Sequence, residues 1–159
     1  MPAVLNSSSV ERVRDALARA GLADTIVELP GAARTARAAA DYLGCDVGQI
    51  ANSLVFRAQE RDAALLVMSS GARRVDVARL AAAAGEPVGK ADAEFVRRHT
   101  GFVIGGVAPV GHGLTQTYVE KSLAAYGELW AAAGHPHTVF RLSYQELVRI
   151  TAGTEVDLA

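Results

Sequence analysis

The sequence predicts an α+β fold in which helices surround a mixed β-sheet. Helical and strand patterns are intermixed along the chain, and two apolar runs follow each other across a short charged tip. Nothing repeats at a fixed period, and no linker composition separates one part from another. At 159 residues the chain is long enough to bury a core without disulfides or a structural metal. We therefore expect one domain over residues 1–159.

The first element expected is an amphipathic helix. Ser8 and Glu11 have the spacing of a capping box, and apolar residues then recur at helical spacing until Gly21. After Gly21, β-branched residues in a loosely alternating pattern predict a strand over residues 25–29, which a Pro-Gly pair ends.

A second helix is expected over the alanine-rich residues 36–43. Thr35 is its predicted N-cap and Gly44 its C-terminal stop. Residues 46–50 then have the pattern of one further helical turn, which leads into the next strand.

The centre of the chain predicts an antiparallel hairpin. Apolar residues 53–56 and 63–68 flank the charged tip at residues 59–62. Two helices closed by glycines are expected to follow, over residues 75–84 and from the cap Asp92 to the residue before Gly101.

The last third of the chain predicts two further strands and a helix. The strands are expected over residues 115–119 and 138–142, and Ser143 with Glu146 forms a capping box for the final helix. Residues 130–134 fit either a strand lined by small side chains or the end of a helix, and residues 123–129 give mixed signals.

The stretch over residues 100–112 is the hardest to explain as packing alone. Its four glycines around short apolar runs predict a strand that breaks into an irregular loop. Gly105 and Gly106 lack Cβ, so a ligand can approach the main chain closely there, before Pro109 and His112. Free backbone N–H groups in such a loop suit a carboxyl, phosphate or ester oxygen. A tight connection that needs glycine only for its geometry is the alternative.

Composition excludes several classes of protein. Sixteen basic and seventeen acidic residues give a net charge of −1, which argues against coating long tracts of nucleic acid. No apolar run approaches the length of a membrane span, and no signal peptide is expected, so we predict a cytoplasmic protein. The lone Cys45 agrees with a reducing compartment. The basic clusters near the glycine loop favour solvated faces, with a small local contact as the alternative: Arg73-Arg74, Lys90 and Arg97-Arg98-His99.

The patterns of several common sites are missing from the sequence. The four histidines do not fall at metal-ligand spacing, so no metal site is expected. The glycine pair lacks the lysine and spacing of a P-loop, the dinucleotide fingerprint is absent, and there is no nucleophile elbow. No organic cofactor is implied.

Several segments together resemble the YbaK-like aminoacyl-tRNA deacylases, the family that includes the editing domain associated with bacterial prolyl-tRNA synthetase. The segments occur in family order over nearly the whole chain: Gly48-Gln49-Ile50-Ala51-Asn52-Ser53-Leu54-Val55-Phe56, Ser70-Gly71 with Arg74-Val75-Asp76, Ala91-Asp92 through Thr100-Gly101-Phe102, Ile104-Gly105-Gly106-Val107-Ala108-Pro109-Val110-Gly111-His112, and Trp130-Ala131-Ala132-Ala133-Gly134.

The resemblance implies the fold and the reaction. The fold is a mostly antiparallel, partly barrel-like sheet surrounded by helices, and the reaction is hydrolysis of the ester that joins a wrong amino acid to a tRNA. The glycine loop would present backbone groups of Gly105, Gly106 and their neighbours to that ester. The attacking group would be a water or part of the substrate, so that position and charge supply much of the acceleration.

One position departs from the family pattern. Family members usually carry a lysine where this chain has Asn52, followed by a small polar residue, here Ser53. An amide still donates a hydrogen bond, although a charge-assisted bond is about twice as strong. Three outcomes stay open: Asn52 performs a weaker version of the same role, a cation such as Arg73 or Arg74 reaches the site, or the domain binds without cleaving.

The resemblance also implies a set of substrate contacts and partners. Small side chains at 131–133 would wall a pocket that recognises the aminoacyl group by size. The partners would be the acceptor end of a tRNA, most simply of the proline type, and prolyl-tRNA synthetase, with the protein a monomer or homodimer that contacts no membrane. The expected substrate-binding residues are Ser53, Thr35, Arg74, Val107, Pro109, Gly111, His112, Ala132, Gly134 and His137.

Overall fold

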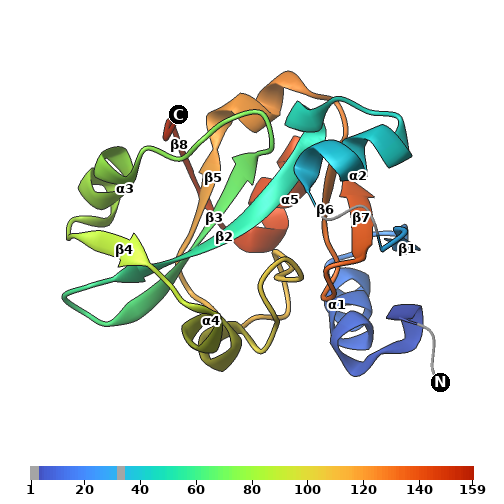
Figure 1. The fold of residues 1–159 in the computed structure, drawn as a ribbon, viewed down its shortest axis with the longest axis horizontal. Coiled ribbons are helices and arrows are strands. Elements are labelled where there is room, and N and C mark those ends of the chain that lie inside the picture. The colour runs from blue at the N-terminus through green and yellow to red at the C-terminus, as the bar shows by residue number, and fades with distance from the viewer. Residues whose placement is uncertain (1–3, 32–34) are drawn as a thin grey trace.

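A computed structural model of the protein describes residues 4–31 and 35–159. Within these residues the α-helices are α1 (Ser8–Arg19), α2 (Ala36–Leu43), α3 (Val77–Ala84), α4 (Ala93–Thr100) and α5 (Tyr144–Thr151), and Figure 1 shows them around one sheet. Short 3-10 helices lie at η1 (Val4–Asn6), η2 (Val47–Gln49) and η3 (Lys121–Ala125). The strands are β1 (Val27–Glu28), β2 (Ile50–Ala58), β3 (Ala63–Ser70), β4 (Val88–Lys90), β5 (Thr117–Glu120), β6 (Leu129–Ala132), β7 (Thr138–Leu142) and β8 (Thr154–Val156).

The strands form one mixed sheet. Its order is β1-β7-β6-β2-β3-β5-β8, and β4 pairs with β2 off this path. Four of the seven strand pairings in the described residues are antiparallel and three are parallel. The ends of the path, β1 and β8, do not pair, so the sheet stays open and does not close into a barrel. The predicted α+β class with a mostly antiparallel sheet is confirmed.

Helices cover both faces of the sheet. The largest apolar cluster joins α1 and α5 to β3 through Val13, Leu17, Leu147, Leu66 and Met68. The intervening β3 residues, Leu65 and Val67, lie in a second cluster with Leu80 of α3. Because successive strand residues alternate between faces, α3 covers the face opposite α5. A third cluster places α2 against the start of β2. No helix in the described residues is long and apolar enough to cross a membrane.

Several predicted elements are confirmed with their caps. The β2–β3 hairpin pairs from Ala51↔Ser70 to Ala58↔Ala63 and turns at the charged tip. Thr35 caps α2, and Gly44 ends it in the left-handed conformation. Asp92 caps α4, which Gly101 ends. The predicted Ser143–Glu146 capping box opens α5, and residues 130–134, left between strand and helix, contribute β6.

Other boundaries differ from the predictions. The side chain of Ser7, and not that of Ser8, accepts the capping hydrogen bond from Val10 N–H at 3.3 Å. The third helix begins two residues later than predicted, because the carboxylate of Asp76 accepts from the N–H groups of Ala78 and Arg79. The strand predicted over residues 25–29 shrinks to β1, which has only two residues.

The predicted strand that opens the glycine loop is wrong. No strand forms between α4 and β5. Phe102 is 1% exposed in the large core cluster, whereas Val103 and Ile104 are 45% and 56% exposed. The N–H of Gly106 donates to the carbonyl of Val103 at 3.0 Å. This hydrogen bond closes a turn, where the prediction expected pairing with another strand. The short strands β4 and β8 were not predicted, because three residues carry too little pattern.

Candidate functional site

The site begins as a gap along one edge of β2. On this edge β6 pairs with Ile50 and Ala51, and β4 pairs with residues 56–58. Neither strand pairs with residues 52–55, which lie between them. The carbonyl of Ile50 accepts from Gly71 N–H on the β3 side. Since backbone groups of successive strand residues face alternate edges, those of Ser53 face the gap.

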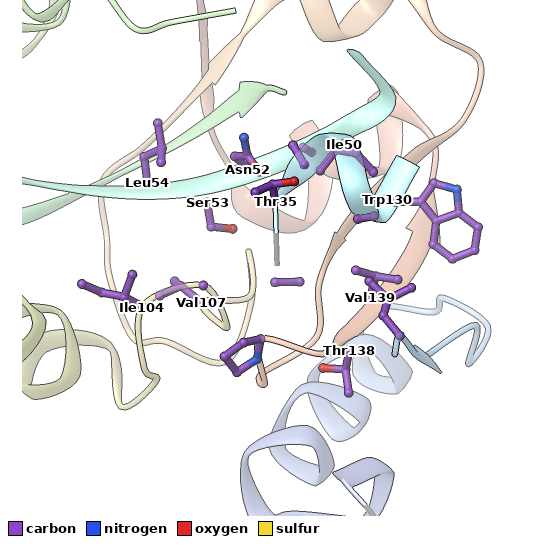
Figure 2. Close-up of a pocket in the computed structure, with 17 residues that line it drawn as sticks. Thr35, Ile50, Asn52, Ser53, Leu54, Ile104, Val107, Trp130, Thr138 and Val139 are labelled. Atoms are coloured by element: carbon purple, nitrogen blue, oxygen red, sulfur yellow. The ribbon is translucent and has the colours of Figure 1, made fainter. Parts of the chain in front are cut away.

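A cavity of about 330 Å³ lies at this gap. Figure 2 shows β2 along one side of it, Ile104 and Val107 on the second, and Trp130, Thr138 and Val139 on the third. The wall is mainly apolar, with a few polar side chains. Its residues come from the start of α2, from β2, from the glycine loop and from β6 and β7: Leu29, Thr35, Ala36, Ala39, Ile50, Ala51, Asn52, Ser53, Leu54, Ile104, Gly105, Val107, Trp130, Ala132, Pro136, Thr138 and Val139.

The glycine loop brings free backbone donors to this cavity. The turn from Val103 to Gly106 holds Gly105 at φ +87°, a value that glycine adopts without strain. A Cβ on Gly106 would lie 2.9 Å from the backbone of His135, so glycine is needed there for the close approach of two main chains. Among the described residues, the N–H groups of Gly105 and Val107 have no hydrogen-bond partner.

Two polar side chains of β2 lie on opposite sides of the strand. Figure 2 shows the hydroxyl of Ser53 on the side of Val107 and the amide of Asn52 on the other side. Ser53 Oγ lies 3.4 Å from the sulfur of Met68, which is a weak acceptor. The Asn52 amide has no hydrogen-bond partner among the described residues. Its cross-strand neighbour Ser69 is 1% exposed, and its hydroxyl is unpaired too.

Residues 30–150, well over half of the chain, match the model of the aminoacyl-tRNA editing domain. The chain belongs to this editing-domain family.

Three individual proteins are similar to the chain over most of its length. A solved structure of a candidate trans-editing enzyme for prolyl-tRNA synthetase is 42% identical and superposes with a TM-score of 0.89, covering 96% of this chain and 97% of that one. A protein used as a scaffold for computational epitope grafting is 40% identical, with a TM-score of 0.89 and the same coverage. The uncharacterized protein YwhH of Bacillus subtilis (strain 168) is 26% identical over 140 residues, 87% of this chain and 88% of that protein.

The cavity of this editing domain contains six of the residues predicted from the sequence. Asn52, Ser53, Gly105, Val107, Ala132 and Thr35 all line it. Thr35 is exposed, and its hydroxyl accepts from Ala38 N–H at 3.0 Å, so it also caps α2. Ala132 alternates along β6 with Ala131, whose side chain is buried in the large core cluster.

His112 closes the glycine loop and is held inside it. Its Nε2 lies 2.9 Å from the carbonyl of Pro109, and its Nδ1 accepts from Leu114 N–H at 2.8 Å. The ring is therefore the neutral tautomer with the proton on Nε2, which donates to Pro109. Burial lowers the pKa of His112, and the nearby Arg12 lowers it further. Neither His112 nor Pro109 is among the described residues that line the cavity.

The remaining predicted substrate contacts are not among the described residues that line the cavity. Gly111 takes φ +78° beside the aliphatic part of Arg12, and a Cβ on Gly134 would lie 2.7 Å from the carbonyl of Ser9 on α1. Arg74 is exposed after β3 and is not a lining residue. The carbonyl of His137 accepts from Leu29 N–H, and its ring lies against that of His135 at 5.3 Å.

Sequence reasoning missed the wall formed by β7 and the start of α2. Ala36, Ala39, Pro136 and Thr138 line the cavity, yet nothing in their local pattern marks them. They reach the site because α2 packs against both β2 and β7, as Ala39, Ile50 and Val139 share one apolar cluster. The described residues contain no group of three or more histidine, cysteine, aspartate or glutamate side chains that could hold a metal ion.

Proposed function

We propose that the protein is a free-standing trans-editing deacylase, which hydrolyses the ester between a wrong amino acid and the 3′ end of a tRNA. One observation carries the proposal: a cavity lined both by the open edge of β2 and by Gly105 and Val107, whose N–H groups have no partner among the described residues. Membership of the aminoacyl-tRNA editing domain family supports the same class of substrate.

The free amides suit the charge that develops during ester hydrolysis. Attack of a water on the ester carbonyl forms a tetrahedral carbon and an oxyanion, and the tRNA hydroxyl then leaves with a proton. In this proposal, the N–H groups of Gly105 and Val107 donate to the oxyanion. Removing one such donor in an enzyme typically costs about 10²–10³ in rate. Fixed donors in a site of low dielectric act without reorganising during the reaction.

The edge of β2 offers the complementary group for the amino end of the substrate. In the proposed complex, the carbonyl of Ser53 faces the gap and accepts from the α-ammonium of the aminoacyl group. Asn52 lines the same cavity from the side of β2 opposite Ser53, and in this proposal its amide, which has no partner among the described residues, donates a further hydrogen bond to a part of the substrate that reaches past the edge of the strand. The amino acid is thus held at both of its polar ends.

The apolar part of the wall would recognise the amino-acid side chain by size. Ala36, Ala39 and Ala132 leave room for a small aliphatic group beside Ile50 and Val139. Size alone discriminates by only about 1–3 kcal/mol per methylene, so the tRNA has to supply further specificity. The similarity to a candidate trans-editing enzyme for prolyl-tRNA synthetase supports a tRNA of the proline type, that synthetase as a partner and a cytoplasmic location.

A second function is favoured by one observation. The amide of Asn52 lies on the side of β2 away from Val107, and it carries no charge. A domain that holds an aminoacyl-adenosine group without cleaving it needs the cavity but no strong electrostatic stabilisation. The rival to the deacylase is therefore a binding module that uses the same cavity.

A deacylation assay over a panel of mischarged tRNAs separates the two functions. We expect the wild type to release an amino acid from at least one of them. Asn52→Ala should lower kcat/KM by roughly tenfold, the effect of one lost hydrogen bond of about 1.4 kcal/mol. Gln59→Ala removes an exposed amide at the hairpin tip and serves as the matched control.

The same assay can also contradict the proposed deacylase activity. An inactive wild type, together with an Asn52→Lys variant that gains activity, would favour the binding module. If the wild type cleaves and Asn52→Ala cleaves as fast as Gln59→Ala, the amide has no part in the reaction, and the backbone donors act without it.

A further inference from the structure

A second cavity continues the first along β2. It has a volume of about 220 Å³ and shares five wall residues with the first, namely Ser53, Leu54, Ile104, Gly105 and Val107. Its other wall residues come from β2, from β4 and the loop that follows it, and from α4. The proposed ester site therefore opens at one end toward β4 and α4.

The only charged side chain in the described wall of this second cavity is Lys90. Lys90 pairs with Phe56 in the β2–β4 ladder and is exposed. Its side chain makes no ion pair or hydrogen bond among the described residues. A cation that lines a cavity without a carboxylate partner is available to an anionic part of a ligand.

Two arginines lie around the aromatic ring next to this cavity. The guanidinium carbons of Arg57 and Arg98 are 5.5 Å and 5.9 Å from the ring centroid of Phe95, which is buried in α4 beside the lining residue Val96. Cation–π contact at such distances is attractive. The ring therefore draws the two arginine side chains to the α4 face of β2. Lys90 pairs with Phe56, whose side chain packs on the α3 face, so the lysine lies across the strand from the arginines, at the wall of the second cavity.

Among these three cations, only Arg57 takes part in an ion pair between described residues. Arg57 pairs with Asp62 at 2.6 Å, but both side chains are about half exposed. Asp92 accepts from Phe95 N–H as the cap of α4, and Glu94 is exposed in the first turn of that helix. Arg98, like Lys90, takes part in no ion pair between described residues.

We propose that Arg57, Lys90 and Arg98, here named the basic shelf, bind phosphates of the tRNA 3′ strand next to the esterified nucleotide. This inference depends on the proposed function, because it places the ester beside Gly105 and lets the strand leave through the second cavity. A net charge of −1 and a shelf of three cations fit a short contact with few phosphates. Base identity is not read here, since such contacts position a strand without specifying its sequence.

The experiment measures the affinity of uncharged tRNA for the wild type and for Lys90→Gln, Arg98→Gln and the double variant, at several salt concentrations. For a single strand, each lost phosphate contact should reduce the slope of log K against log salt by roughly 0.7. The double variant should therefore lose about 1.4 of slope and bind several-fold more weakly at low salt. Lys90→Arg should restore the slope.

Arg19→Gln and Lys121→Gln are the matched controls, because both are exposed, unpaired cations outside the two cavities. They remove the same charge, so equal losses in controls and shelf variants would overturn the shelf. A shelf variant that binds tRNA like the wild type, but loses binding to prolyl-tRNA synthetase, would also overturn it and indicate an acidic protein surface instead.

A kinetic readout separates this inference from the proposed function. With mischarged tRNA, loss of the shelf should raise KM more than it lowers kcat. If the wild type deacylates and the shelf variants keep both the KM and the salt slope of the controls, the shelf is wrong while the deacylase stands. If uncharged tRNA binds through the shelf and no mischarged tRNA is cleaved, the deacylase is wrong and the shelf stands.

Discussion

At the scale of single residues, the site depends on main-chain groups more than on side chains. Gly105 and Val107 supply free N–H groups, and Ser53 supplies backbone groups that no strand pairs. Backbone donors are present whatever the side chain, so the free N–H groups of Gly105 and Val107 do not depend on the residue at position 52. Asn52 brings no charge to the cavity, and Lys90 of the proposed basic shelf lines the adjoining second cavity.

His112 makes the stability of the glycine loop depend on pH. Burial lowers its pKa from 6.5, so the folded state binds fewer protons than the unfolded state. The stabilisation is complete above the unfolded pKa and is lost as the pH falls through and below about 6.5. We expect the urea midpoint of the wild type to decrease between pH 7.5 and pH 5.

The variant His112→Asn isolates that effect. Its amide oxygen can still accept from Leu114 N–H, while the bond to Pro109 is lost, which costs about 1 kcal/mol at pH 7.5. Between pH 7.5 and pH 5 its midpoint should fall less than that of the wild type. Because the other histidines are common to both proteins, equal decreases would show that His112 does not titrate across this range.

At the scale of elements, caps determine where the helices begin. The sequence places serines at positions 7, 8 and 9 before α1, and the spacing to Glu11 favoured Ser8. In the structure Ser7 takes extended backbone angles, its hydroxyl accepts from Val10 N–H, and Ser8 is exposed in the first turn. Capping boxes could be recognised from the sequence, but not which of three adjacent serines leaves the helix.

Replacing these serines tests the assignment. Ser7→Ala should cost about 1 kcal/mol of unfolding free energy and lower the melting temperature by roughly 2–4 °C. Ser8→Ala should change either quantity little, since alanine is a good helix former and no cap is lost. Calorimetry on the two variants measures both, and a larger loss for Ser8→Ala would show that the helix begins one residue later.

Some helices and strands could be predicted from local sequence patterns, but the gap in the sheet could not. The β2–β3 hairpin, α2, α4 and α5 follow from strong local signals at Thr35, Asp92 and Ser143. The gap in the sheet could not be predicted from local signals, because it depends on where β6 and β4 stop pairing with β2. Single-sequence reasoning named Asn52, Ser53, Thr35, Ala132 and the glycine loop but missed Ala36, Ala39, Pro136 and Thr138, which reach the cavity through the topology of the chain.

At the scale of the whole molecule, an interrupted sheet provides the site. The edge of β2 is paired at both ends and open in the middle, and the glycine loop covers that opening (Figures 1 and 2). An unpaired strand edge attracts extended chains. Here the loop restricts access to that edge to a cavity of about 330 Å³, enough for a small aminoacyl group.

The most direct test of this account fills the cavity and measures turnover. Ala132→Leu adds bulk to the wall, whereas Ala82→Leu adds the same bulk to an exposed position of α3. With a mischarged tRNA of the proline type, the account predicts that Ala132→Leu lowers kcat/KM by at least about tenfold, or 1.4 kcal/mol, while Ala82→Leu matches the wild type. A wild type that deacylates this tRNA, with an Ala132→Leu variant that deacylates it equally fast, would contradict the claim that the ester binds in the gap of the sheet.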